Sequence, residues 1–325
     1  MKEILEKLLL NQNLTRIEVW DTFSKIMKGD MSESQIAGFL IALRAKGVSA
    51  EEISVSAEIM RDSAKKVCIN SNEAMDTCGT GGAKVKTFNV STATAFVLAA
   101  AGVTVAKHGN RSNTSASGSS DVLRALGVNI EMTQEETEKK INEGGIGFLF
   151  APLYHPAMKY VVPVRKDLEV RTIFNLLGPL INPAAVKYQI IGVFEECLIN
   201  TFAFALQELG HKRAIVVYGE GGLDEFSLIG PSKYALLEDG NITLNTLEVE
   251  DVGLSKASLS DLVGGGPKEN AEIIENILKG KDTGPKSDLV ALNAGAGLFV
   301  ANKASSIKEG VGIAKEILVS GKALE

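Results

Sequence analysis

The chain has 325 residues, of which 45% are hydrophobic and 23% are charged. This composition is typical of a globular protein, and the length suffices for two domains. With 34 Lys and Arg against 40 Asp and Glu, the net charge is −6. That charge argues against binding to duplex nucleic acid, which depends on excess positive charge. The three cysteines are widely spaced, which indicates a reducing compartment rather than a disulfide framework. No secretory signal is recognisable, and the apolar run 94–106 is too short to span a membrane. We therefore expect a cytoplasmic protein that does not associate with membranes.

The first 66 residues predict a small all-helical domain. Thr15, Ser32 and Ser49 are each followed three positions later by Glu or Gln, which is the capping-box pattern of a helix start. Apolar residues then recur at helical spacing, and no strand pattern interrupts them. Four short helices cannot bury all of these apolar faces among themselves. We therefore expect this domain to carry the contact surface of a homodimer.

From about residue 74, short apolar runs alternate with helical patterns, which predicts an α/β domain around a central, largely parallel sheet. We expect this domain to extend over 74–325. Asp239-Gly240 predicts a hairpin turn between two further strands. The expected strands are 103–106, 146–151, 190–194, 214–218 and 226–229, with the hairpin at 234–238 and 242–247. The expected helices are 92–101, 120–126, 134–143, 199–209, 269–279, 288–302 and 306–320.

A first polar cluster joins a glycine turn to the start of a helix. The turn runs from Gly79 to Gly82, and Asn89, Ser91 and Thr92 follow at the predicted helix start. Glycines let backbone amides approach a ligand, and the free amides of a helix N-terminus attract anions. The pattern therefore favours a phosphate site, although a plain helix cap after a glycine turn is the alternative.

A second polar cluster follows the strand predicted at 103–106. Lys107 and Arg111 bring positive charge to the carboxyl end of that strand, where ligands collect in open α/β sheets. The loop after them is rich in hydroxyl groups, at Ser112, Thr114, Ser115, Ser117 and Ser119. So polar a segment makes a poor core, and we interpret it as a phosphate loop rather than a solvated surface loop.

Three further features point to chemistry, each with a common structural alternative. Asp224 and Glu225 lie on a glycine-rich loop, and such carboxylates suit magnesium, although most acidic pairs are merely solvated. Arg165 has the planar fork that holds a carboxylate in two parallel hydrogen bonds, although a surface ion pair is the usual role of an arginine. His108 and His155 fall in strand-end loops, where a structural role is the more common one.

Read together, these segments resemble the anthranilate phosphoribosyltransferase family, in that family's order. The resemblance implies a nucleoside-phosphorylase-like fold, in which a helical domain over 1–66, with a returning segment near 165–185, joins an α/β domain over 74–325. The active site would lie at the hinge between them. The segments that carry the resemblance are 76–82 (DTCGTGG), 87–92 (TFNVST), 107–112 (KHGNRS), 147–152 (GFLFAP), 154–158 (YHPAM), 171–180 (RTIFNLLGPL) and 223–225 (LDE).

The resemblance implies a magnesium-dependent transfer of the phosphoribosyl group of 5-phosphoribosyl 1-pyrophosphate to anthranilate, in tryptophan biosynthesis. By matching position, Lys107, His108 and Arg165 would be catalytic, and Ser91, Asp224 and Glu225 would hold Mg²⁺. Phosphoribosyl pyrophosphate would be held by Gly79, Gly82, Ala83, Thr87, Asn89, Val90, Ser91, Thr92, Lys107, His108, Gly109, Asn110, Arg111, Ser112, Asn113, Thr114, Ser115 and Ser119. Anthranilate would be received by Gly79, His108, Asn110, His155, Arg165 and Gly178.

The chain departs from the family pattern in both phosphate loops. Ala83 stands where the family usually has Asp, and Lys84 and Lys86 follow it. In the second loop, Asn113-Thr114 and Ala116 replace the more usual residues. We interpret the first departure as a reduced dependence on a second magnesium and a greater dependence on lysine charge.

Two alternatives belong to other functional classes. A pyrimidine nucleoside phosphorylase of the same fold would carry a Lys-His-Ser-Gly-Arg type of loop, whereas the residues from Lys107 to Arg111 read Lys-His-Gly-Asn-Arg. A non-enzymatic, nucleic-acid-binding relative of the fold would need a basic groove, which the net charge of −6 disfavours.

Overall fold

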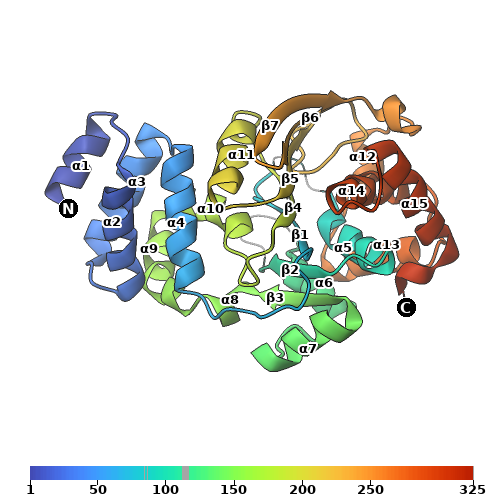
Figure 1. Ribbon diagram of the computed structural model, residues 1–325, viewed down its shortest axis with the longest axis horizontal. Coiled ribbons are helices and arrows are strands. Elements are labelled where there is room, and N and C mark those ends of the chain that lie inside the picture. The colour runs from blue at the N-terminus through green and yellow to red at the C-terminus, as the bar shows by residue number, and fades with distance from the viewer. Residues whose placement is uncertain (84, 86, 112–116, 325) are drawn as a thin grey trace.

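The protein is described by a computed structural model that covers residues 1–83, 85, 87–111 and 117–324. The N-terminal helices form one end of the molecule, a twisted sheet crosses its middle, and the C-terminal helices form the other end (Figure 1). Within the described residues, no helix combines the length and the apolar character needed to cross a membrane.

The N-terminal helices begin where the capping boxes predict. Thr15, Ser32 and Ser49 are the N-caps of α2, α3 and α4, and each accepts a hydrogen bond from the backbone N–H three residues later. These predicted helix starts are therefore confirmed. The helices of this part are α1 (Lys2–Leu9), α2 (Arg16–Lys28), α3 (Glu33–Lys46) and α4 (Ala50–Asp62).

The sheet has seven strands in the order β3-β2-β1-β4-β5-β6-β7. Neighbours from β3 to β5 are parallel, and β6 and β7 form the antiparallel hairpin that Asp239-Gly240 predicts. The expected α/β fold with a largely parallel sheet is confirmed. The strands are β1 (Met75–Gly79), β2 (Val105–Gly109), β3 (Ile146–Phe150), β4 (Tyr188–Gly192), β5 (Arg213–Gly219), β6 (Ser232–Glu238) and β7 (Asn241–Leu247).

One strand assignment from the sequence is wrong, and one strand was not predicted. The segment 226–229 forms no strand, because its backbone is held by side chains: Phe226 N–H donates to Asn293 Oδ1 at 3.0 Å, and Ser227 N–H donates to Ser232 Oγ at 2.9 Å. Conversely, the central strand β1 was not predicted, since its sequence MDTCG lacks an apolar run.

Helices cover both faces of the sheet, and successive strand residues serve the two faces in turn. Ile190 and Ile215 belong to the core that α5 and the C-terminal helices share, whereas Ile191 and Val216 belong to the core beneath α11. The predicted helices all form, with small shifts at their ends. The helices of this part are α5 (Val90–Ala100), α6 (Ser119–Ala125), α7 (Gln134–Gly144), α8 (Ala151–Tyr154), η1 (Pro156–Tyr160), α9 (Val162–Leu168), α10 (Phe174–Leu177), η2 (Gly178–Leu180), α11 (Leu198–Glu208), η3 (Val249–Val252), α12 (Leu259–Leu262), α13 (Pro267–Leu278), α14 (Pro285–Val300), α15 (Ile307–Ser320) and η4 (Lys322–Leu324).

The core of the N-terminal helices continues into one face of the sheet. Phe23 and Phe39, both fully buried, belong to the same apolar cluster as Phe202 of α11 and Val216 of β5. The short helices η1 and α9 return to this end of the molecule and pack against α2 and α3. The N-terminal helices are thus held to the larger part by burial of apolar surface and not only by the connecting chain.

The strand order fixes where a ligand can enter. From β1 the chain moves outward through β2 and β3, and from β4 it moves outward in the other direction. The order therefore reverses between β1 and β4, which pair directly. In open α/β sheets such a reversal leaves a crevice at the carboxyl ends of the strands, and ligands bind there.

Candidate active site

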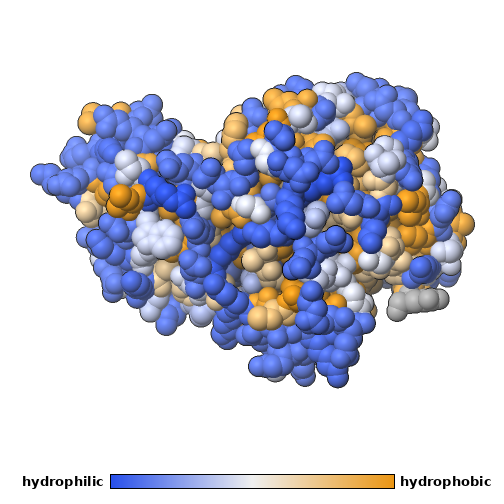
Figure 2. Space-filling view, viewed as in Figure 1, coloured by the Kyte–Doolittle hydropathy of each residue, from blue (hydrophilic) through white to orange (hydrophobic). Residues whose placement is uncertain are grey.

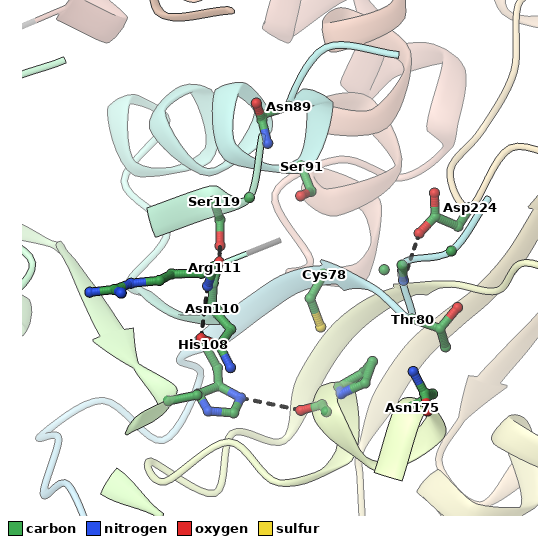
Figure 3. A pocket seen from close by; sticks show the side chains of 18 of the residues that line it. Cys78, Thr80, Asn89, Ser91, His108, Asn110, Arg111, Ser119, Asn175 and Asp224 are labelled. Carbon is green, nitrogen blue, oxygen red and sulfur yellow. Dashed lines mark hydrogen bonds between the residues drawn. The ribbon is translucent and has the colours of Figure 1, made fainter. Parts of the chain in front are cut away.

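A cavity of about 700 Å³ opens at this crevice. One wall comes from the carboxyl ends of β1 and β2 and the start of α5. The opposite wall comes from Met60 of α4 and from the segment 151–181, which packs against the N-terminal helices. Figure 3 shows Asn89 and Ser91 on one side of the pocket, Asp224 across from Ser119, and His108 near its lower edge. The cavity thus lies between the two parts of the chain.

The glycine turn after β1 and the start of α5 form one side of the cavity, the glycine-turn side. Gly81 and Gly82 both have left-handed backbones, with φ of 68° and 80°. Asn89 is the N-cap of α5, but its side chain makes no capping bond. Its amide is instead oriented from two sides, since Asn270 Nδ2 donates to Asn89 Oδ1 at 3.0 Å and Asn89 Nδ2 donates to Ser117 O at 3.2 Å. At this helix start the N–H groups of Val90 and Thr92 donate to the carbonyl oxygens of Phe88 and Asn89, whereas the N–H of Ser91 has no acceptor among the described residues. The Ser91 amide and the dipole of the helix can therefore attract an anion.

The two carboxylates reach the cavity because their loop lies directly on the strand ends. A Cβ atom at Gly192 would lie 1.5 Å from the carbonyl oxygen of Asp224, and one at Gly79 would lie 2.2 Å from Asp224 Oδ2. Only glycine allows such an approach. Asn293 of α14 holds the same loop from behind, because its side chain bonds both the N–H and the C=O of Phe226.

Burial makes these carboxylates costly to ionise in the protein alone. Asp224 accepts a hydrogen bond from Gly81 N–H at 3.0 Å, and Glu225 accepts one from Thr87 Oγ1 at 2.8 Å. Burial nevertheless raises the pKa of Asp224, and burial together with the neighbouring Asp224 raises the pKa of Glu225 well above its usual range. A cation between them would remove this cost.

The donor set fits magnesium that is completed by a substrate. No cluster of three or more His, Cys, Asp or Glu side chains among the described residues could hold a metal by itself. Magnesium commonly binds one or two carboxylates, with water and substrate phosphates as its remaining ligands. Asp224, Glu225 and the hydroxyl of Ser91 line the same cavity, so oxygen ligands are available on the glycine-turn side.

Lys107 lies buried between β1 and α5. Its Nζ donates to the carbonyl oxygen of Thr77 and, at 3.3 Å, to Ser91 Oγ. Burial lowers the pKa of Lys107, and the nearby carboxylate of Asp76 opposes that shift. Asp76 is itself fully buried in the central strand, and burial raises its pKa to about 6. This cation and this carboxylate thus stabilise each other's charged forms beneath the cavity.

The hydrogen bonds of His108 and His155 define their tautomers. His108 Nδ1 lies 3.2 Å from the carbonyl oxygen of Gly178, which can only accept, so Nδ1 carries the proton. In a neutral ring His108 Nε2 must then accept from His155 Nε2, which lies 3.2 Å away. Burial lowers the pKa of His108 well below its usual range and lowers that of His155 to about 4. Both imidazoles are therefore neutral at pH 7.

Arg165 of α9 lies on the wall opposite the glycine-turn side. Its guanidinium is 5.8 Å from the ring centroid of Phe174, and burial lowers its pKa. No hydrogen bond or ion pair joins the guanidinium of Arg165 to another residue in the described part of the chain. Its donors are thus available to a carboxylate in the cavity.

Most of the residues that the sequence singles out line this one cavity. Thr92 does not, because it lies one position further around α5 and its side chain is buried. Residues 112–115, together with Lys84 and Lys86, lie outside the described residues. The predicted residues that line the cavity are Gly79, Gly82, Ala83, Thr87, Asn89, Val90, Ser91, Lys107, His108, Gly109, Asn110, Arg111, Ser119, His155, Arg165, Gly178, Asp224 and Glu225.

Several polar residues that line or support the cavity were not predicted from the sequence. Arg171 and Asn175 belong to the segment RTIFNLLGPL, which is part of the resemblance, but no role was predicted for these two side chains. Asn270 and Asn293 lie on C-terminal helices, where a single asparagine carries no recognisable motif. Asp76 was visible only as the first residue of DTCGTGG.

Comparison with known proteins gives matches over nearly the whole chain. Residues 2–64 match the helical bundle domain of a glycosyl transferase family, and residues 71–324 match the a/b domain of that family. The anthranilate phosphoribosyltransferase of Petrotoga mobilis is 50% identical over 99% of this chain and 93% of its own length. That of Streptococcus pneumoniae is 46% identical over 100% and 97%.

Solved structures agree with these relatives. The anthranilate phosphoribosyltransferase of Thermus thermophilus has a TM-score of 0.93 and 44% identity, over 99% of this chain and 96% of that one. The Saccharomyces cerevisiae enzyme in complex with PRPP and Mg has a TM-score of 0.90 and 31% identity, over 99% and 94%. The chain therefore belongs to the anthranilate phosphoribosyltransferase family, and it is a transferase.

Proposed function

We propose that the chain transfers the phosphoribosyl group of 5-phosphoribosyl 1-pyrophosphate to anthranilate, in tryptophan biosynthesis. The observation that carries this proposal is the pairing of two unlike walls in one cavity. One wall has a helix start, a glycine turn and two carboxylates, which suit a magnesium pyrophosphate. The other has an arginine whose side chain has no hydrogen-bond partner among the described residues, and two neutral imidazoles, which suit an aromatic carboxylate.

On the first wall, the turn at Gly79–Gly82 and the start of α5 would receive the phosphates, with Asn89 and Thr87 as side-chain partners. Lys107 would place a buried positive charge beneath the pyrophosphate. Asp224, Glu225 and Ser91 would hold magnesium, which would draw charge from the leaving pyrophosphate when bound. The Saccharomyces cerevisiae relative, which was solved with PRPP and Mg, supports this assignment.

On the second wall, Arg165 would take the carboxylate of anthranilate in two parallel hydrogen bonds. His108 and His155 would flank the ring, with Asn110, Gly178 and the backbone of Gly79 completing the site. Their neutral state suits this task, because neutral imidazoles do not compete with Arg165 for the negative charge of the substrate carboxylate. A Saccharomyces cerevisiae relative solved with 4-fluoroanthranilate supports a site for this class of ligand.

The reaction is then a substitution at the anomeric carbon. The amine lone pair forms the new N–C bond, the C–O bond to pyrophosphate breaks, and the nitrogen gives up one proton. A neutral aromatic amine is already nucleophilic, so the chain needs no strong base. The rate would come from holding the two reactants in line and from stabilising the charge that develops on the departing oxygen.

We also propose a homodimer through the N-terminal helices. Large apolar side chains stay exposed there, with Leu9 at 71%, Leu10 at 68% and Ile17 at 74%. Figure 2 shows apolar patches at this end of the molecule within a mostly hydrophilic face. The proposal includes a cytoplasmic location and the division into a helical domain over 1–66, with a return near 165–185, and an α/β domain over 74–325.

The direct test of the proposed function is an assay of anthranilate fluorescence with phosphoribosyl pyrophosphate and magnesium. We expect the fluorescence to fall only when all three are present, with one pyrophosphate released for each anthranilate consumed. Retention of the fluorescence with every component present would contradict the proposal.

Replacing Arg165 by Ala should raise the KM for anthranilate about ten- to a hundredfold and change the KM for phosphoribosyl pyrophosphate much less. A hydrogen bond to a charged partner contributes about 1.5–3 kcal/mol, which gives this range. Steady-state kinetics with each substrate varied in turn measures both constants. Arg165→Lys serves as the matched control, and its KM for anthranilate should lie between that of the unchanged protein and that of Arg165→Ala. Equal effects on both substrates would show that Arg165 is structural.

Replacing Asp224 by Asn and Glu225 by Gln together should abolish turnover without lowering the melting temperature. The amide oxygens can still accept from Gly81 and Thr87, and the charge of Asp224 that raises the pKa of Glu225 is gone. Thermal unfolding and a magnesium titration of the rate measure the two effects. Normal turnover of the double variant would remove this pair from the metal site.

None of the three histidines should titrate between pH 8 and about pH 5. Burial lowers the pKa of His108, His155 and His211 below the ordinary value of about 6.5. The unfolded chain takes up these protons as the pH falls below that value, and the folded chain does not. The free energy of unfolding should therefore fall as the pH is lowered from about 6.5 toward 4. Imidazole NMR signals and urea unfolding at several pH values measure both effects, and a ring midpoint near 6.5 would contradict the assignment.

A further inference from the structure

The glycine turn at Gly79–Gly82 is also held by a residue from the opposite side of the cavity. Arg171 lies in the segment between α9 and α10, on the side that packs against the N-terminal helices. Its Nη2 donates a hydrogen bond of 2.6 Å to the carbonyl oxygen of Gly82. Its guanidinium carbon lies 4.2 Å from the ring centroid of Phe194, just after β4. The side chain thus crosses the cavity and is fixed at its tip.

The turn is shaped to receive this guanidinium. Gly82 has a φ of 80°, which a residue with a side chain rarely adopts. A Cβ atom there would also lie 2.7 Å from Nη2 of Arg171. A side chain at Gly82 would therefore strain the turn and displace the guanidinium of Arg171 from its present position.

The contact fixes a peptide group for which the described residues of the α/β part provide no other hydrogen bond. Thr80 N–H donates to the carbonyl oxygen of Gly192 at 2.8 Å, and Gly81 N–H donates to Asp224 Oδ2 at 3.0 Å. In the residue that follows, Gly82, the carbonyl oxygen accepts the hydrogen bond from Arg171. The C=O and the N–H of a trans peptide point in opposite directions, so a carbonyl group turned toward Arg171 turns the N–H of Ala83 away from it.

The backbone of Arg171 is in turn held by the N-terminal helices. Nη1 of Arg44, on α3, donates to the carbonyl oxygen of Arg171 at 2.9 Å. A continuous series of contacts therefore runs from α3 through Arg171 to the turn at Gly82. This series is independent of the shared apolar core beneath α11.

We propose that Arg171 is a positioning residue that holds the Gly81–Gly82 turn in its anion-receiving shape from across the cavity. The affinity of the turn for pyrophosphate then depends on where the N-terminal helices stand. The inference rests on the proposed function only for the identity of the anion. The contact itself orders the turn in the free protein.

The experiment compares Arg171→Ala, Arg171→Lys and Arg44→Ala with the unrelated surface variant Arg124→Ala. Hydrogen exchange of the Thr80 and Gly81 amides is measured without any ligand, and the binding of inorganic pyrophosphate with magnesium is measured by calorimetry. For Arg171→Ala we expect exchange at Gly81 to accelerate by about tenfold or more and pyrophosphate binding to weaken about ten- to a hundredfold. Arg171→Lys keeps one donor and should recover part of both effects.

Arg44→Ala should change both measurements in the same direction by a smaller factor, and Arg124→Ala should change neither. Arg44 and Arg124 are exposed, so the Arg44 variant keeps the test open if Arg171→Ala fails to fold. Unchanged exchange at Gly81 in Arg171→Ala would overturn the proposal, and weakened pyrophosphate binding with unchanged exchange would make Arg171 a direct ligand instead. The exchange measurement needs no turnover, so its result is separable from failure of the proposed transfer reaction.

Discussion

The close packing of the Asp224 backbone on the ends of β1 and β4 is the constraint on which the site depends. The two strands pair directly, and both end in glycine, so the loop that follows β5 can lie across them. Without that approach the carboxylates would stand away from the point where the strand order reverses. The backbone amides of the glycine turn and the acidic side chains would then not face the same cavity. Alanine at Gly192 would force the loop outward, because the atom in the way is backbone and cannot rotate aside.

Asp76, which is fully buried, and the half-buried Asp224–Glu225 pair illustrate opposite uses of carboxylates inside a protein. Asp76 accepts from the N–H of His108 and from Nδ2 of Asn182, and it faces the positive charge of Lys107. Its interactions are satisfied within the chain, so it joins β1, β2 and the segment after η2. In the Asp224–Glu225 pair each carboxylate accepts one hydrogen bond from another described residue, and the charge of Asp224 raises the pKa of Glu225. That pair is arranged for a cation that comes from outside the chain.

Sequence patterns predicted the helices and the parallel strands well, because periodic apolar residues and capping boxes are local signals. The central strand β1 escaped because Asp76 and Thr77 are polar, and their burial is made possible by partners far along the chain. The segment 226–229 looked like a strand because Phe226 and Leu228 are buried, yet side chains rather than a neighbouring strand hold its backbone. Among site residues, the ordered motifs located most of the cavity wall. Arg171, Asn270 and Asn293 act through distant backbone atoms, and no local pattern reports such contacts.

The apolar cluster that joins the N-terminal helices to α11 also bears on how the chain is made. Phe23 and Phe39 are buried together with Phe202, which is synthesised much later. During translation the first four helices therefore leave the ribosome before their principal packing surface exists. Their apolar faces stay exposed through the synthesis of most of the sheet, which invites chaperone binding or association with another nascent copy. The shared apolar core fixes the N-terminal helices to the rest of the protein. The same core delays their folding until the middle of the chain has been synthesised.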